Sequence, residues 1–230
     1  MYQMKWFLET WWTIIVRPIY FYTKLKEEDW KEKALTFLLM NCGILAAVGS
    51  LVIFIIQYIT IGRTLVEGVA GIKFLIVLPV LITLAFVFFL ITLLILGGIL
   101  VLNFFVVFYL IGILLHYVYL MLGGKGSRNR MLQSSFYSSA VILAGIFVFL
   151  LMILTKHGGL EFALFRAGYN LIYFLVALYV YGLWAVAGRK TYGVPRWKAF
   201  AGALVPLILL LIFGILFDKI ALSKFQPWIT

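Results

Sequence analysis

Charge is missing from most of this chain. Five runs contain no Asp, Glu, Lys or Arg, and they are residues 34–62, 74–124, 131–155, 167–188 and 199–217. A helix rises about 1.5 Å per residue, so roughly 20 apolar residues cross a hydrocarbon core about 30 Å thick. Each run reaches or nearly reaches that length. The sequence therefore predicts a protein that spans a membrane.

The overall composition gives the same answer. Charged residues are 12% of the chain and hydrophobic residues 65%, against roughly 25% and 45–50% in soluble domains. The runs are continuous blocks of Leu, Ile, Phe and Val, whereas the strands of a membrane barrel are short and alternate apolar with polar residues. We therefore predict an all-α fold, a polytopic bundle of transmembrane helices.

Cysteine and histidine are nearly absent, which limits the chemistry of the chain. Cys42 is the only cysteine, so there is no disulfide framework and no cysteine-based metal site. Metal chemistry needs clustered His and carboxylates, yet His116 and His157 are the only histidines and stand far apart. A serine nucleophile would need a partner base, and His116 is the only candidate within a run. We expect no enzyme activity and no cofactor.

The first 33 residues differ from the rest of the chain because they mix aromatic rings with charges. Tryptophans and cations are typical of the head-group region of a bilayer, and here they are Trp6, Trp11, Trp12, Lys5, Arg17, Lys24 and Lys26. Glu9 interrupts the apolar stretch, so this is not a signal peptide. Pro18 predicts a break into two short helices. We predict an interfacial amphipathic segment at 1–33; the alternative is a flexible tail.

The number of crossings depends on the 51-residue run 74–124. As one helix it would be about 76 Å long, which is enough for two crossings. Gly97 and Gly98 offer a hairpin turn between them. Length alone therefore predicts six transmembrane helices.

The distribution of Lys and Arg favours a different answer. With six crossings and the N-terminus inside, these residues divide 10 inside against 9 outside, whereas an odd number of crossings gives 13 against 6. The positive-inside rule prefers the second arrangement. We predict five crossings in the cell membrane, a cytoplasmic N-terminus, and a re-entrant or embedded helix at 74–96, giving six apolar helices. The transmembrane domain would cover 34–222 and a short tail 223–230.

The middle of the chain carries a specific pattern. His116 near the end of a run is followed by Gly123-Gly124-Lys125-Gly126-Ser127 and then by Tyr137-Ser138. In this order the motifs resemble the signature of the Yip family, the Ypt/Rab-interacting membrane proteins. Further matches in the same order are Pro18 with Phe21, Leu183-Trp184 and Trp197-Lys198-Ala199.

The resemblance covers residues 10–217 and implies five spans. The chain lacks the long hydrophilic N-terminal domain and the Asp-Leu-Tyr-Gly-Pro element of eukaryotic members. It is therefore similar to the prokaryotic members, and we expect no GTPase partner.

Two groups of residues are candidates for function. The cations after the predicted spans could contact anionic head groups or a partner, or be solvated loop charges, and they are Lys125, Arg128, Arg130, Arg189, Lys190, Arg196 and Lys198. Polar residues inside the runs are expected to tie helices together, among them His116, Ser134, Ser135, Ser138 and Asn103. We expect His116 to bond one of these serines; a proton- or ligand-handling role is the alternative.

These features predict a non-enzymatic membrane-organising protein, a scaffold or adaptor. Its partners would be the bilayer, anionic head groups and other membrane proteins or a second copy, with no nucleic acid. The alternative is a small-solute or lipid transporter or channel. An ion-coupled carrier would be expected to place charged residues within the membrane, and the five runs contain none. An intramembrane enzyme is the least favoured class.

Overall fold

The structure, a computed structural model, describes residues 2–58 and 72–229, and this part of the chain is helical without strands. The helices before the gap are α1 (Tyr2–Val16), α2 (Pro18–Lys24), α3 (Lys33–Ile53) and the π-helix η1 (Phe54–Tyr58). Those after it are α5 (Ile72–Met121), α6 (Arg128–Tyr137), the 3-10 helix η2 (Ser138–Ala144), α7 (Gly145–Lys156), α8 (Phe162–Tyr192), α9 (Arg196–Leu216), the π-helix η3 (Phe217–Leu222) and α10 (Ser223–Ile229).

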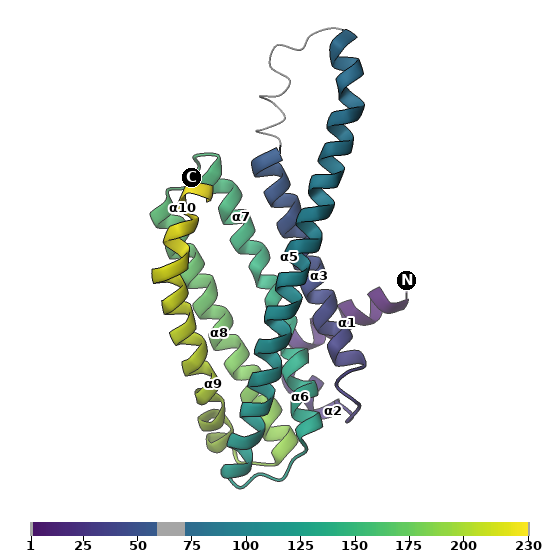
Figure 1. Ribbon diagram of the computed structural model, residues 1–230. Helices are drawn as coiled ribbons and strands as arrows, with labels where there is room; N and C mark the ends of the chain where they lie inside the picture. Colours follow the sequence, from purple (N-terminus) through teal and green to yellow (C-terminus); the bar gives the residue numbers. More distant parts are fainter. Residues whose placement is uncertain (1, 59–71, 230) are drawn as a thin grey trace.

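Five helical stretches of the described chain are long and apolar enough to cross a membrane. They are Lys33–Gln57, Phe74–Met121, Arg128–Lys156, Phe162–Tyr192 and Arg196–Leu222. Successive stretches run in opposite directions along the bundle (Figure 1). We call the end formed by residues 25–32, 122–127 and 193–195 the basic end, and the end formed by residues 157–161 and α10 the far end.

The hairpin predicted at Gly97-Gly98 is wrong. α5 is one helix of 50 residues, about 75 Å long. The predicted embedded helix at 74–96 is therefore the first half of α5, and in Figure 1 α5 extends beyond the far end of the bundle. Five long apolar helices are present in the described residues, not six.

Backbone energetics explain why the two glycines do not form a turn. A Cβ at Gly97 would make only an ordinary contact with the Cβ of Ala46 in α3, at 3.7 Å, and one at Gly98 would meet nothing within 4 Å. A glycine inside a helix costs only about 1 kcal/mol relative to alanine, whereas a turn within hydrocarbon would leave several backbone groups without partners. The continuous helix is the lower-energy solution.

The third membrane-length stretch is continuous but not uniformly α-helical. Between α6 and α7 the chain tightens into the 3-10 helix η2. The Ser138 hydroxyl donates to the carbonyl of Ser135, three residues earlier, at 2.6 Å. Serine side chains that bond nearby carbonyls compete with the regular helical pattern, which accounts for the change here.

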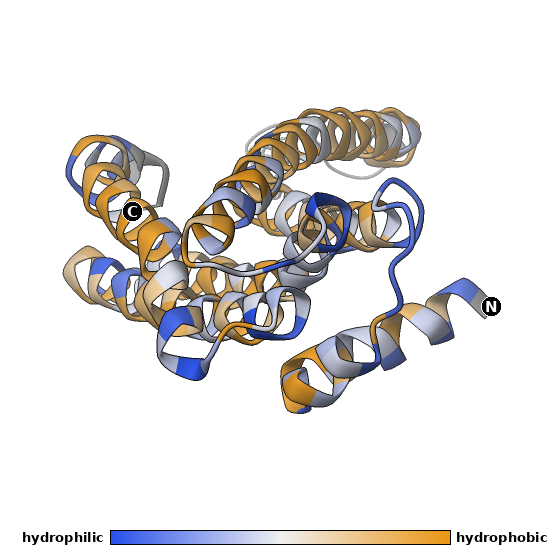
Figure 2. Cartoon of the chain, turned by 90° about the horizontal axis from the view of Figure 1, so that it is seen from below, coloured by the Kyte–Doolittle hydropathy of each residue, from blue (hydrophilic) through white to orange (hydrophobic). Residues whose placement is uncertain are grey.

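The N-terminal helices break at Pro18, as predicted, and lie beside the bundle. Viewed from below in Figure 2, α1 lies across the view while most of the spanning helices are seen nearly end-on. The Trp11 indole donates to the carbonyl of Ala140 at 2.9 Å, and the Tyr179 hydroxyl donates to that of Ile15 at 2.6 Å. Both bonds hold α1 against the spanning helices.

Candidate functional site

The glycine-rich turn of the family-like signature packs directly on the end of α8. The backbone N–H of Lys125 donates to the carbonyl of Tyr192 at 3.1 Å. A Cβ at Gly124 would lie 2.6 Å from the Cβ of Tyr192, and one at Gly126 would lie 2.6 Å from the carbonyl oxygen of Thr191. Since neither contact is possible for a residue with a side chain, glycine is required for this close approach.

The acidic segment after α2 covers this turn. The Ser127 hydroxyl accepts from the backbone N–H of Arg130 at 3.1 Å, capping α6, and donates to the carboxylate of Glu27. The Asn129 side chain donates to the carbonyl of Glu28 at 2.9 Å. The turn is therefore closed over by the N-terminal segment and is not a bare positive loop.

The seven predicted cations all lie at the basic end, but their surroundings differ. The Lys198 ammonium donates to the carbonyl of Leu122 at 2.8 Å, and the Arg130 guanidinium donates to that of Leu25 at 3.3 Å. These two side chains therefore bond carbonyl groups just after the ends of α5 and α2. Lys190 is half-buried. The other four cations are exposed and form no ion pair among the described residues, and they are Lys125, Arg128, Arg189 and Arg196.

The partner of His116 is not one of the predicted serines. Its Nδ1 lies 2.5 Å from the hydroxyl of Tyr192, the last residue of α8. The hydroxyls of Ser135 and Ser138 are taken up elsewhere, and that of Ser134 has no partner among the described residues. The prediction chose serines that follow His116 closely in the sequence, whereas its partner in the structure, Tyr192, is 76 residues away.

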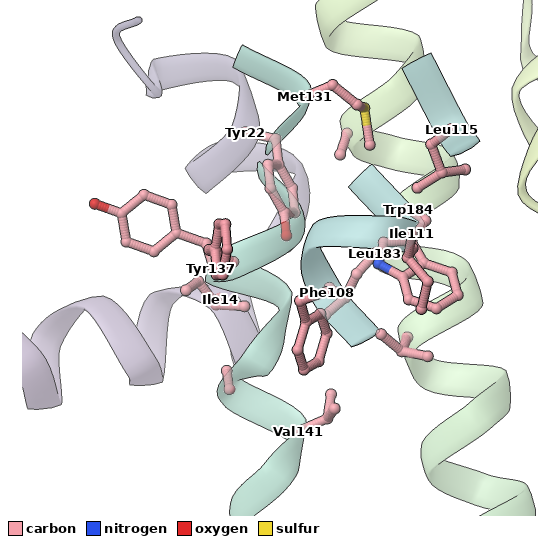
Figure 3. Close-up of a cluster of buried hydrophobic side chains, with 14 of the residues drawn as sticks. Ile14, Tyr22, Phe108, Ile111, Leu115, Met131, Tyr137, Val141, Leu183 and Trp184 are labelled. Atoms are coloured by element: carbon pink, nitrogen blue, oxygen red, sulfur yellow. The ribbon is translucent and has the colours of Figure 1, made fainter. Parts of the chain in front are cut away.

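The serines link α5, α6 and α8 in a chain of buried bonds. The Ser135 hydroxyl donates to the carbonyl of Phe108 at 2.6 Å, and the Trp184 indole donates to the Ser138 hydroxyl at 2.9 Å. Figure 3 shows Trp184 and Phe108 within the buried cluster that these bonds cross. Asn103 differs from them, because it is exposed and bonds the carbonyl of Ile99 in its own helix.

Tyr119 is the central residue that the sequence reasoning missed. Its hydroxyl donates to the carbonyls of Ala199 at 2.8 Å and Trp184 at 3.2 Å, joining α5 to α8 and α9. A Cβ at Gly188 or Gly202 would collide with its ring. The glycines that face this aromatic side chain were the available signal, but they lie on two helices far from Tyr119 in the sequence.

Tyr22 plays a similar part for the N-terminal segment. Its buried hydroxyl donates to the carbonyl of Ser134 at 3.4 Å and so connects α2 to α6. Burial raises the pKa of Tyr22 well above its usual range. The side chain therefore remains a neutral donor throughout the physiological pH range.

His116 is not the only ionisable group in the membrane-length helices. Arg166 lies about one turn into α8, and its Nε donates to the carboxylate of Asp218 in η3 at 2.7 Å. Asn170 donates to the same carboxylate at 3.2 Å. Because Arg166 precedes the fourth uncharged run and Asp218 follows the fifth, the run boundaries hid this pair. It joins α8 to η3 towards the far end.

An apolar cavity of about 330 Å³ lies between the spanning helices. Its wall includes Trp184 and Phe108 on the side of the basic end, and Tyr169 and Phe217 on the side of the Arg166–Asp218 pair. From residue 169 to 184, α8 rises about 22 Å. The lining is almost entirely hydrocarbon and aromatic, so the cavity suits an apolar molecule or chain.

Two kinds of reactive site were considered from the sequence, a metal centre and a serine paired with His116. In the part of the chain that the structure describes, no three His, Cys, Asp or Glu side chains come together in a way that could hold a metal ion. Ser138 is bonded to Trp184 and Ser135, whereas His116 is bonded to Tyr192. His116 therefore does not act as a base for Ser138 in this arrangement. The arrangement offers hydrogen bonds, exposed cations and an apolar cavity.

The fold and these sites define an all-helical protein with five membrane-length helices, which buried hydrogen bonds join next to the basic end. Comparisons with protein-family models, curated proteins and solved structures found no match for this chain. The resemblance to the Yip family remains a prediction from the sequence motifs.

Proposed function

We propose that this protein is a non-enzymatic, Yip-like integral membrane protein that organises its membrane as a scaffold or adaptor. It acts through helix packing, contacts with lipid head groups, and partner membrane proteins. The observation that carries this proposal is the N-terminal helix α1, which packs against the bundle on one face and exposes an apolar stripe on another.

The faces of α1 explain how it would act on a bilayer. Phe7 and Ile14 are buried against the bundle, while the exposed apolar stripe consists of Met4, Leu8, Trp12 and Val16, spaced four residues apart. An amphipathic helix of this kind lies in the plane of the interface and inserts its apolar face among the acyl chains. Insertion into one leaflet expands that leaflet and favours curvature.

The orientation in the membrane is part of the proposal. The basic end carries most of the Lys and Arg residues, so the positive-inside rule favours a cytoplasmic basic end and an N-terminus on the same side. The exposed cations Lys125, Arg128, Arg189 and Arg196 would then lie on the cytoplasmic side of the membrane.

Vesicle shape tests the membrane-organising role. Reconstituted wild-type protein is expected to reduce vesicle diameter or form tubules in electron micrographs. Leu8→Glu places a charge in the stripe and is expected to abolish this effect, because the carboxylate opposes insertion. Gln3→Glu adds the same charge at an exposed position of α1 outside the stripe and is expected to leave it. Vesicles unchanged by wild-type protein would overturn the proposal.

Cysteine labelling tests the orientation. In a Cys42→Ala background, Lys125→Cys is expected to react only from the cytoplasmic side and Ser223→Cys only from outside, and both positions are exposed. The predicted outer terminus, Thr230, lies outside the described residues, which is why Ser223 is chosen. Labelling of both positions from one side would contradict an odd number of crossings.

The apolar cavity supports a second candidate, a lipid carrier or channel. Trp184 lines the cavity but is only 1% exposed, so bilayer lipids reach it only by entering the cavity. In a variant retaining Trp184 as its sole tryptophan, brominated acyl chains are expected to quench its fluorescence if a chain occupies the site. Ala177→Phe narrows the cavity and is expected to reduce quenching. Unquenched Trp184 would rule this candidate out.

A further inference from the structure

A second, chemically different cavity lies between the N-terminal helices and α6. Its volume is about 280 Å³, and its wall comes from α1, α2, the segment that follows α2, and α6. On α1 the lining residues are Trp6, Thr10 and Thr13. At 100° per residue these lie on the side of the helix roughly opposite the apolar stripe. This cavity therefore faces away from the surface that would enter the bilayer.

Two cations at this cavity have no acidic partner. Lys24 and Lys26 line it, and among the described residues neither forms an ion pair. The third lysine, Lys33, is paired with Glu28 at 3.0 Å. The Lys24 ammonium also lies 5.1 Å from the ring centre of Tyr20, which limits its range of positions. Two lysines without an acidic partner among the described residues thus border the cavity.

The remaining polar groups supply both donors and an acceptor. The hydroxyls of Thr10 and Tyr137 have no bonding partner among the described residues, and Figure 3 shows the Tyr137 hydroxyl pointing away from the buried cluster. Gln133 is 1% exposed and uses its amide N–H to donate to the carbonyl of Lys26 at 3.1 Å. Its Oε1 is buried without a partner in the described chain. A buried acceptor is destabilising until a donor reaches it.

We propose that this cavity binds a phosphate ester that carries a hydroxyl or primary ammonium group. The phosphate oxygens accept from the Lys24 and Lys26 ammonium groups and from the Thr10 hydroxyl, because lysines and hydroxyls are effective phosphate donors. The hydroxyl or ammonium of the same ligand reaches the acceptors of the cavity, Gln133 Oε1 and the Glu28 carboxylate. Aromatic rings of Trp6 and Phe21 flank the ligand.

This chemistry has two natural sources. A phosphatidylglycerol or phosphatidylethanolamine head group contains both parts, and so does a free ester such as glycerol phosphate. The site goes beyond the proposed function, because it lies on the opposite side of α1 from the apolar stripe and does not depend on membrane bending.

Calorimetry on the full-length protein in detergent tests the site. The probes are short-chain phosphatidylglycerol, glycerol 3-phosphate, short-chain phosphatidylcholine and inorganic phosphate. Saturable binding is expected for short-chain phosphatidylglycerol, glycerol 3-phosphate or both. Binding of phosphatidylglycerol alone would assign the lipid head group as the ligand. Binding of glycerol 3-phosphate of similar strength assigns the free ester. Phosphatidylcholine or inorganic phosphate binding equally well would overturn the role of the hydroxyl or ammonium donor.

Charge variants identify the residues involved. Lys24→Gln and Lys26→Gln are each expected to weaken binding roughly tenfold or more, the effect of losing one charged hydrogen bond. Both side chains are exposed, so folding is not at risk. Lys31→Gln is the matched control. Lys31 is an exposed lysine of the same segment after α2, but its ammonium lies over the Trp30 ring and it does not line the cavity. No saturable binding by any probe, or an equal loss in Lys31→Gln, would overturn the proposal.

Discussion

In the half of the bundle next to the basic end, Tyr119, Phe136 and Trp184 are each at most 1% exposed and hydrogen bonds join their helices. The far half is looser. Its buried cluster consists of Phe165 and Leu222 with partly buried neighbours, and the 330 Å³ cavity extends into it from Trp184 to Phe217. The helices are therefore held together by buried side chains and hydrogen bonds next to the basic end, whereas in the far half they leave an apolar cavity between them.

The two halves can be compared by replacing one phenylalanine with alanine in each. Phe136→Ala is expected to destabilise the protein by about 3–5 kcal/mol, because Phe136 is fully buried and stacks on Trp30 at 5.1 Å. Phe213→Ala in the far half is expected to cost far less, since that ring is 62% exposed and lipid replaces its contacts. Unfolding in mixed detergent measures both. Equal losses would mean that the far half is as tightly packed as the base.

Two glycines of α8 sharpen the contrast. Gly188→Ala forces a methyl group into the ring of buried Tyr119 and is expected to cost about 1–3 kcal/mol. Gly168→Ala meets only the end of the Leu151 side chain, which can turn away in looser surroundings, so we expect a change near zero. Gly182→Ala has no neighbour within 4 Å and is the control for helix propensity alone. A larger loss at Gly168 than at Gly188 would reverse the comparison.

Substitutions of His116 separate a structural role from a proton-handling one. His116→Leu leaves the Tyr192 hydroxyl with only a marginal bond and is expected to cost about 1–3 kcal/mol, whereas His116→Gln keeps a bonding group and should cost about 1 kcal/mol or less.

A proton-leak measurement in liposomes that contain a pH-sensitive dye is the second test of the role of His116. We expect no proton leak from the wild type, because protonating an imidazole in the membrane without a carboxylate beside it is unfavourable. A leak that His116→Gln abolishes would favour the transporter alternative over the scaffold.

Sequence reasoning succeeded where the property is local. Uninterrupted apolar runs indicate helices wherever they stand, and the charge count chose an odd number of crossings, in agreement with five membrane-length helices. The break at Pro18 follows from its fixed backbone angle and missing N–H. The same reasoning failed at Gly97, because glycine is compatible both with a turn and with a helix interior, and a turn within hydrocarbon would leave backbone groups without partners.

Composition and the long uncharged runs by themselves determined the class of this protein. A run of 51 residues without charge is compatible with hydrocarbon surroundings, and it leaves few alternatives to membrane-length helices. The tertiary structure alone decided which residues meet. Tyr192 faces His116, Tyr119 enters the space that two distant glycines leave, and Gln133 lines a cavity with Lys24 of α2 and Lys26 just after it. Such contacts depend on how helices are rotated and stacked, and apolar helices of similar composition can pack in many ways.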